Sequence, residues 1–313
     1  MELERSGDAL GDGLFLPEAG LFYALIRERA EPHFLHDPMV AHTWRSEPQS
    51  FRAMARPPVS PLDYDTVASA YDRRYALRDY RGIRDTLLAA VRVDSGSTRP
   101  TVLEIGCGTG KWLRELASAD CDVAGIDPSR EMLAKAAGLA GADLRVGVAD
   151  ALPWKEKSFD VVCCVNAFHH FASPDRALAE SWRVLRPGGV FVSIGMDPHE
   201  NRDRWSLYDF FPETLPLDLA RFPSRARRIA WLEAANFVNP SVSVAEHLKS
   251  SSTFDEALAD GIIERTYTSQ LTLLTDEQYA AGVSRIRDEA ARNADFRLVA
   301  DIVLYVTEAR KPL

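Results

Sequence analysis

Residues Val102–Gly110 read VLEIGCGTG, and the rest of the chain is arranged around this stretch. An apolar run that carries one carboxylate passes directly into three glycines at alternate positions, and the amphipathic segment KWLRELAS follows. This order is typical of a strand, a tight turn and a helix. Gly106, Gly108 and Gly110 lack a Cβ and adopt positive φ readily, so the backbone can turn sharply and approach a ligand closely. The stretch predicts a nucleotide-binding loop.

Counting residues tests two well-known nucleotide loops. A P-loop needs a glycine five residues before Gly110 and a Ser or Thr after the lysine, but the chain has Ile105 and Trp112 there. The dinucleotide fingerprint needs a third glycine where the chain has Lys111. The spacing therefore argues against an ATPase and disfavours NAD.

The whole chain has the composition of a soluble globular protein, with 313 residues, 46% of them hydrophobic and 27% charged. A formal net charge of −9 argues against nucleic acid as a partner. The four cysteines show no metal-ligand spacing, the N-terminus lacks an apolar leader, and no apolar run approaches the ~18 residues of a membrane span. We expect a cytoplasmic protein with reduced thiols that needs neither a metal nor a membrane.

Strand-like and helix-like segments alternate after the glycine loop. Expected strands are CDVAGID, ADLRVGVAD, SFDVVCCVNAF, GGVFVSIGM, VNPSVSVAEHL and LVADIVLYVTEAR; expected helices include SREMLAKAAG, capped by Ser129, DRALAESWRVL and RARRIAWLEAANF. This pattern predicts the α/β class, with a doubly wound Rossmann-like sheet of about seven mostly parallel strands, the last of them antiparallel. We expect a helical extension and linker over residues 1–62 and one domain over 63–313, with cap insertions at about 198–223 and 248–295.

Five motifs in order, from Val102 to about Ser193, carry a resemblance to a known family. They are EIGCGTG, GIDPSREML, VADALPWKEKSFDVV, HHF and RVLRPGGVFV. Together they resemble the class I S-adenosylmethionine-dependent methyltransferases of the type found in ubiquinone and menaquinone biosynthesis and in related small-molecule methylation. The resemblance implies a Rossmann-like transferase that uses S-adenosylmethionine and releases S-adenosylhomocysteine.

The resemblance also implies a set of cofactor-binding residues. Asp127, 17 residues after Gly110, can accept both ribose hydroxyl protons. Asp150 ends the expected third strand beside the adenine amino group, and Glu104 helps to hold the methionine ammonium. Other interpretations are a helix cap for Asp127, core packing for Met132 and a turn for Asn166. The expected residues are Glu104, Gly106, Cys107, Gly108, Gly110, Asp127, Pro128, Met132, Asp150, Ala151 and Asn166.

Methyl transfer from a sulfonium requires alignment of nucleophile, methyl and sulfur, with a base where the nucleophile carries a proton. His169 and His170 are the expected catalytic residues because histidine titrates near working pH, and Asp197 and His199 are further candidate bases. The alternative role of the HHF histidines is to pack or to orient the loop.

The acceptor site is expected to come from the additions to the core. Aromatic walls with few polar groups predict a small, planar or apolar acceptor, and the same aromatics could instead attach a lid. The chain has NAFH where enzymes that methylate nucleobases and glutamine have an Asn/Asp-Pro-Pro-aromatic motif, so O, C and other N acceptors stay open. The expected substrate-binding residues are Tyr64, Tyr71, Tyr75, His199, Trp205, Tyr208 and Arg265, with Phe211, Tyr267 and Gln270 beside them.

The leading hypothesis is an enzyme that methylates a small molecule, as a monomer or homodimer. The rival is a catalytically inactive regulator or partner subunit that binds S-adenosylmethionine. A third possibility is another sulfonium-assisted reaction, such as a cyclisation.

Overall fold

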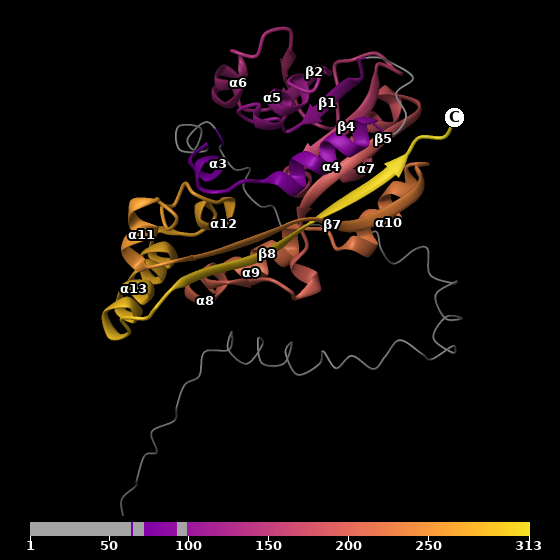
Figure 1. The fold of residues 1–313 in the computed structure, drawn as a ribbon. Helices are drawn as coiled ribbons and strands as arrows, with labels where there is room; N and C mark the ends of the chain where they lie inside the picture. The colour runs from indigo at the N-terminus through magenta and orange to yellow at the C-terminus, as the bar shows by residue number, and fades with distance from the viewer. Residues whose placement is uncertain (1–63, 65–71, 93–98) are drawn as a thin grey trace, which may run out of the picture. The chain divides into compact units, whose positions relative to one another are not determined.

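The computed structural model describes Tyr64 and residues 72–92 and 99–313, and an eight-stranded sheet forms its centre (Figure 1). Five strands are parallel, in the spatial order β3 (Asp143–Val146), β2 (Asp122–Asp127), β1 (Thr101–Ile105), β4 (Phe159–Val165) and β5 (Leu185–Met196). Their carboxyl ends share one edge, which is where open α/β sheets bind ligands.

Three further strands complete the sheet through antiparallel pairing with β8. β8 (Leu298–Arg310) pairs with β5 on one side and with β7 (Val238–Ser252) on the other, and the short β6 (Arg204–Trp205) also pairs with β8. The predicted fold class is confirmed: the sheet is Rossmann-like and mostly parallel, and its last strand, β8, runs antiparallel to the others.

Helices cover both faces of the sheet because the side chains of each buried strand alternate between two cores. Val102 of β1 lies in one core with α4 (Arg81–Arg92), α5 (Lys111–Ala117) and Leu133 of α6 (Arg130–Ala136). Leu103 lies in the other with α7 (Pro174–Val184) and α10 (Arg225–Ala234). The predicted cap of α6 is confirmed, since the Ser129 hydroxyl accepts a hydrogen bond from the N–H of Met132 at 3.0 Å.

The third strand is shorter than the sequence pattern predicts. β3 ends at Val146, although the apolar alternation continues to Asp150. Val146 is paired with Asp127, the last residue of β2, and the N–H of Gly147 donates to the carbonyl of Asp127 at 3.1 Å. Beyond that point β2 offers no further ladder partner, so the chain leaves the sheet.

Two inserted segments, residues 197–222 and 253–296, form what we call the lid. Its helices are η4 (Pro198–Glu200), α8 (Ser206–Phe210), α9 (Thr214–Arg221), α11 (Phe254–Ala259), α12 (Ser269–Thr272) and α13 (Asp276–Arg292). They share a hydrophobic core that includes Phe211, Leu271 and Ile286. Figure 1 shows α11, α12 and α13 at one end of the long β7–β8 ribbon, with α8 and α9 along it. Each fully buried side chain of this size stabilises the lid by about 1.5–3 kcal/mol.

The short helix α3 (Arg73–Leu77) is tied to two parts of the molecule. The hydroxyl of Thr109 in the glycine loop donates to Asp72 Oδ1 at 2.6 Å, and Arg73 forms an ion pair with Glu264 of the lid at 3.0 Å. The predicted extension over residues 1–62 lies outside the described residues. Among the helices that the structure describes, none is long and apolar enough to cross a membrane.

Candidate functional site

The glycine loop follows β1 at the carboxyl edge of the sheet. Gly106, Gly108 and Gly110 have φ angles of 72°, 52° and 78°, in the left-handed region that side chains disfavour. A Cβ on Gly106 would also lie 2.5 Å from the Cβ of Ala167. The N–H of Gly106 donates to the carbonyl of Ile126 at 2.8 Å, which fixes the loop to the end of β2. Cys107 is buried under the loop, and burial raises the pKa of its thiol well above its usual range.

Asp127 ends β2 and holds the loop from the other side. Its two carboxylate oxygens accept hydrogen bonds from the N–H groups of Gly108 and Ser129, both at 2.9 Å. An ionised carboxylate has about four lone-pair sites, so these oxygens can also accept the hydroxyl protons of a ribose. Asp127 therefore orders the backbone of the loop, and the same oxygens have the chemistry expected of a ribose-binding residue.

Glu104 is a buried carboxylate on β1, 1% exposed, and its Oε2 has no hydrogen-bond partner among the described residues. Burial raises the pKa of the Glu104 carboxyl well above its usual range, and the charge of Asp127 raises it further. A bound ammonium would satisfy this oxygen and favour the ionised form. The site therefore fits a ligand that carries both a ribose and a cation, as S-adenosylmethionine does.

The expected adenine-side residues lie around the ends of β2 and β3. Met132 is buried, Asp150 is half-buried, and Pro128 and Ala151 are exposed. The sequence analysis missed two apolar residues here: Val146, next to Asp127 in the ladder, is 45% exposed, and Val148 is 50% exposed. The available signal was the pair of valines near the end of the strand, because exposed apolar side chains there can pack against a flat ring.

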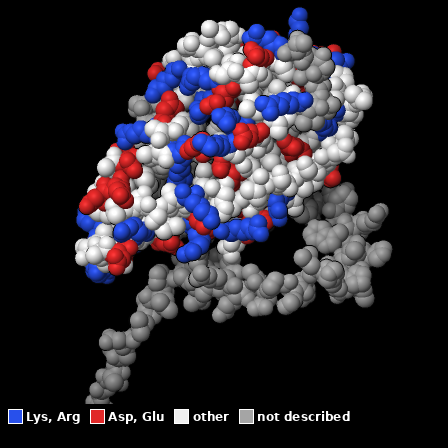
Figure 2. Space-filling model, in the orientation of Figure 1, with Lys and Arg blue, Asp and Glu red and all other residues white. Residues whose placement is uncertain are grey.

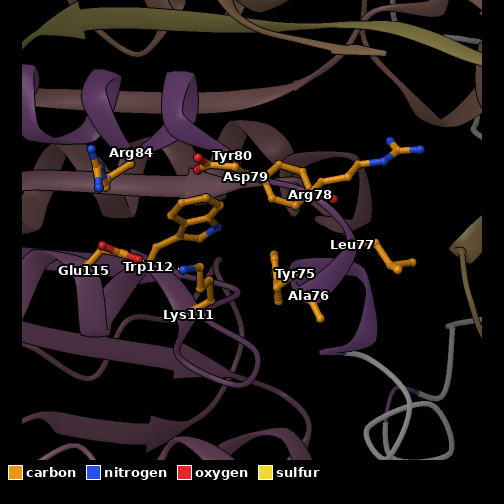
Figure 3. A pocket seen from close by; sticks show the side chains of 10 residues that line it. All are labelled: Tyr75, Ala76, Leu77, Arg78, Asp79, Tyr80, Arg84, Lys111, Trp112 and Glu115. Carbon is orange, nitrogen blue, oxygen red and sulfur yellow. Dashed lines mark hydrogen bonds and ion pairs between the residues drawn. The ribbon is translucent and has the colours of Figure 1, made fainter. Parts of the chain in front are cut away.

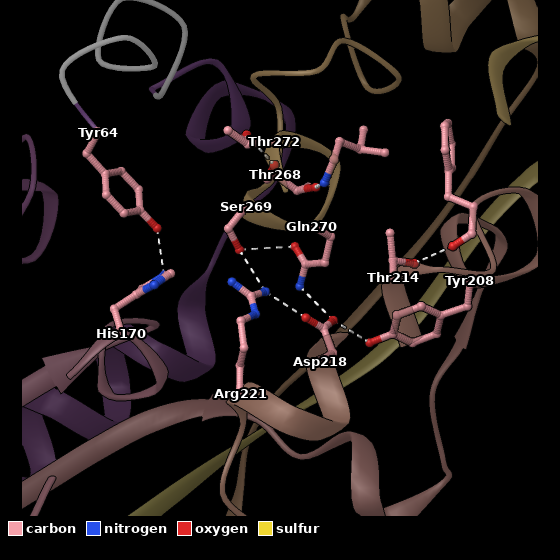
Figure 4. Close-up of polar contacts among 12 residues, drawn as sticks. Tyr64, His170, Tyr208, Thr214, Asp218, Arg221, Thr268, Ser269, Gln270 and Thr272 are labelled. Carbon is pink, nitrogen blue, oxygen red and sulfur yellow. Dashed lines mark hydrogen bonds and ion pairs between the residues drawn. The ribbon is translucent and has the colours of Figure 1, made fainter. Parts of the chain in front are cut away.

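The two histidines lie in the short helix η3 (Phe168–His170), directly after β4. The imidazole of His170 contacts that of His169 at 3.9 Å between centroids, and its Nε2 is 2.6 Å from the hydroxyl of Tyr64 (Figure 4). His169 also stacks on Phe222 at 3.9 Å and 18° between the planes. Asn166, two residues before the helix, has a φ of 51°, which directs this loop away from β4.

A cavity of ≈ 140 Å³ lies against these histidines. Its lining brings together η3, α3, β7, β8 and both segments of the lid. Of the residues expected to bind the acceptor, it includes Tyr64, Tyr75 and Trp205, together with Tyr267 and Gln270. Asn166 also lines it, so the cavity adjoins a residue expected to contact the cofactor.

Other expected residues make contacts within the lid and do not line this cavity. Tyr208 donates to Asp218 at 2.8 Å, Arg265 pairs with Asp276, and His199 Nε2 is 2.9 Å from the carbonyl of Phe222. The candidate base Asp197 is buried and paired with Arg228 at 3.3 Å. Phe211 belongs to the lid core. Tyr71 lies outside the described residues.

A second, larger cavity of ≈ 370 Å³ adjoins α3 and α5 (Figure 3). Tyr75, Tyr80 and Trp112 line both cavities, and their rings meet edge to face at 5.6–6.3 Å. The sequence analysis missed Tyr80, Trp112 and Phe222. Trp112 had a usable signal, since it follows the glycine loop by two residues; Phe222 had none, because it lies far along the chain from the histidines that it contacts.

Comparison with known proteins gives a consistent result. A family model described as a methyltransferase domain matches residues 103–193. The demethylmenaquinone methyltransferase of Lactiplantibacillus plantarum is 30% identical over 186 residues, which cover 54% of this chain and 76% of that protein. An uncharacterised methyltransferase of Mycobacterium tuberculosis is 35% identical over 129 residues, 41% of this chain, and the match spans 49% of that relative's length.

A solved structure shows the same fold. It is a methyltransferase assigned to an antibiotic biosynthesis pathway in Anabaena variabilis, with 22% identity and a TM-score of 0.56, and the match covers 74% of this chain and 97% of that one. The sheet topology, the glycine loop and the family model together define an α/β protein of the methyltransferase class. The chain belongs to the class I S-adenosylmethionine-dependent methyltransferases, and S-adenosylmethionine is its cofactor.

Proposed function

We propose that this protein transfers the methyl group of S-adenosylmethionine to a small molecule bound in the ≈ 140 Å³ cavity. The observation that carries the proposal is the position of this cavity. It adjoins Asn166 after β4, on the same edge of the sheet as the glycine loop, and both histidines line it. An acceptor placed there would lie beside the cofactor with two titratable groups next to it.

The reaction is an in-line displacement. The cofactor supplies an electrophilic methyl group on a sulfonium. The acceptor's nucleophilic O, N or C atom forms a bond to that methyl, the S–CH₃ bond breaks, and its electron pair stays on sulfur in S-adenosylhomocysteine. Holding donor and acceptor in line accelerates this reaction, because the loss of translational and rotational freedom has already occurred on binding.

The chain's own residues handle the proton of the acceptor. His170 is the stronger base candidate, since its Nε2 faces the Tyr64 hydroxyl and can take a proton from an acceptor group in the same position. His169 lies between His170 and Phe222, so its stacking holds the neighbouring imidazole in place. His169 is then a positioning residue, and His170 is the catalytic one.

Three measurements test the proposal. Calorimetry should detect binding of S-adenosylmethionine and of S-adenosylhomocysteine, and a methyl-labelled donor should label a member of a panel of small phenols, enols and amines. His170→Gln should lower turnover by ~10²–10⁴-fold and leave the affinity for S-adenosylhomocysteine unchanged. His247→Gln is the matched control, because His247 pairs with Asp301 on the β7–β8 ribbon and does not line the cavity.

The outcomes separate the competing ideas. Binding of the cofactor with no methyl transfer to any small molecule would favour a regulator or partner subunit. Full turnover of His170→Gln at every pH would remove that histidine from the mechanism. Absence of cofactor binding in folded protein would overturn the proposal as a whole.

A further inference from the structure

The described lining of the acceptor cavity has basic side chains and no acidic ones, although the chain as a whole is acidic. Arg74, Arg78 and the two histidines line it, and no Asp or Glu is among the described residues in its lining. The chain as a whole has 46 acidic and 37 basic residues, and Figure 2 shows both signs interspersed over the face it presents. The cavity therefore departs from the composition of the chain and from the mixed charge of that surface.

Arg78, directly after α3, is the more informative of the two arginines. It is half-buried, and its Nη2 donates to the hydroxyl of Ser250 on β7 at 2.6 Å. Among the described residues, no Asp or Glu forms an ion pair with Arg78. Two arginines close to it in the sequence do form ion pairs: Arg73 pairs with Glu264, and Arg81 pairs with Asp79.

The contact with Ser250 orients the guanidinium without neutralising it. A hydroxyl accepts one hydrogen bond from a group that has five N–H donors in a fixed plane. Arg78 lines both cavities, next to the rings of Tyr75 and Tyr80 (Figure 3). A half-buried cation beside aromatic walls interacts with an anion more strongly than a solvated one does, because the local dielectric is lower.

The arginine fork selects for shape as well as charge. Its planar donors match the two oxygens of a carboxylate in a bidentate arrangement, which a lysine ammonium cannot reproduce. Tyr75, Tyr80 and Trp205 supply flat apolar surface in the same lining. The described lining thus combines a site for a planar anion with a site for a ring.

We propose that the acceptor is an aromatic carboxylate, whose carboxyl group is held by Arg78 while its nucleophilic atom lies at the histidine pair. This inference rests on the proposed methyl transfer and narrows it to one chemical class. The carboxylate is the recognition group, so the methyl group goes to another atom of the acceptor and the product keeps its negative charge.

Matched pairs of probes test this directly. Mono- and dihydroxybenzoates would be compared with the corresponding hydroxybenzamides, which have nearly the same shape and no charge. Binding would be measured by calorimetry in the presence of saturating S-adenosylhomocysteine, and methyl transfer would be measured with a labelled donor. We expect at least one benzoate to have a kcat/KM at least tenfold above that of its amide.

Variants then assign the preference to Arg78. Arg78→Gln should raise the KM of the benzoate by ~10–100-fold and leave the amide unaffected, and Arg78→Lys should recover only part of the loss. Arg73→Gln is the matched control, since Arg73 lies on α3, which directly precedes Arg78, but pairs with Glu264 and does not line the cavity. Its preference for the benzoate should match that of the wild type.

Each result has a separate meaning. Equal use of benzoates and benzamides, or a preference for the amides, would overturn the anionic acceptor. Failure of every benzoate to bind while S-adenosylhomocysteine binds would also overturn it and would leave the proposed methyl transfer standing. Failure of S-adenosylhomocysteine to bind would overturn the proposed function itself.

Discussion

The cofactor side and the acceptor side of this protein are built in different ways. The cofactor side comes from consecutive turns at one sheet edge, where backbone groups of the glycine loop are held by Asp127 and backbone carbonyls. The acceptor side comes from α3, η3 and two lid segments far apart in the chain, and it is held by side-chain contacts. Local backbone geometry therefore positions the cofactor, and packing between distant segments of the chain positions the methyl acceptor.

The two segments of the lid are joined by a buried network of polar side chains. Asp218 is 0% exposed and accepts hydrogen bonds from Arg221 at 2.6 Å, Tyr208 at 2.8 Å and Gln270 at 2.9 Å (Figure 4). Burial raises the pKa of Asp218 despite these partners, among which Arg221 has the largest opposing effect. Three donors converge on one carboxylate and join both segments of the lid.

The largest expected effect comes from breaking this network. Asp218→Ala should destabilise the protein by about 3–5 kcal/mol, because it leaves the buried charge of Arg221 without its carboxylate. Chemical denaturation would measure the loss, and hydrogen exchange should locate it in α9 and α12. Tyr208→Phe, which removes one donor, should cost only about 1 kcal/mol. Affinity for S-adenosylhomocysteine should stay near wild type; an equal loss there would show that the two sides are not separable.

The reciprocal test is Gly106→Ala. The new Cβ would meet the Cβ of Ala167 at 2.5 Å in a backbone region that L-residues avoid. We expect loss of cofactor affinity by ~100-fold, about 3 kcal/mol, with unchanged hydrogen exchange in the lid. Adding Ala167→Gly should restore part of the affinity, since it removes the clash but not the unfavourable φ. Gly138→Ala is the control, because its Cβ would meet no atom within 4 Å; an equal loss in that variant would contradict the explanation.

The same contrast explains how far the sequence could predict the structure. The strand order and the glycine loop follow from local periodicity and spacing, and Asp127 lies where the count from Gly110 predicts. Tyr208 and Arg265 were expected at the acceptor but contact Asp218 and Asp276, since the composition of an inserted segment does not tell which neighbour a side chain meets. The contact between Phe222 and His169 could be identified only from the structure, because the two residues are far apart in the sequence.

The lid also contains a half-buried carboxyl group whose ionisation makes the stability of the protein depend on pH. Asp203, at the start of the lid, accepts the N–H of Val303 at 2.8 Å, and its buried Oδ2 has no hydrogen-bond partner among the described residues. Burial raises the pKa of Asp203 to about 6; Asp197 and Asp301 raise it further, whereas the Val303 N–H and His247 lower it. The unfolded chain ionises at lower pH than the folded one. This carboxyl group therefore reduces stability progressively as pH rises from about 4 to about 6, and the reduction is complete above that window.

Asp203→Asn should remove this pH dependence. The free energy of unfolding of the variant, relative to wild type, should rise by up to about 3 kcal/mol between pH 4 and pH 7, since the shift is about two units. Denaturation curves at a series of pH values would measure it. Asp301→Asn is a useful comparison, because the pKa of exposed Asp301 is lowered, mainly by its hydrogen bond to His247, so the trend there should be opposite in sign and smaller. A constant difference across pH would show that folding does not shift the pKa of Asp203.

The smallest expected effect lies where the two sides meet. The hydroxyl of Thr109, in the glycine loop, donates to Asp72 beside α3, and Arg78, directly after α3, lines the acceptor cavity. Thr109→Val preserves the shape of the side chain and removes this hydrogen bond, so it should cost about 1 kcal/mol. Because the backbone of the loop is held independently by Asp127 and Ile126, we expect an unchanged Kd for S-adenosylhomocysteine and a KM for the acceptor raised a few-fold. Thr109→Ser keeps the donor and should behave as wild type. If the cofactor Kd changed as much as the acceptor KM, α3 would contribute to cofactor binding, and it could no longer be assigned to the acceptor side alone.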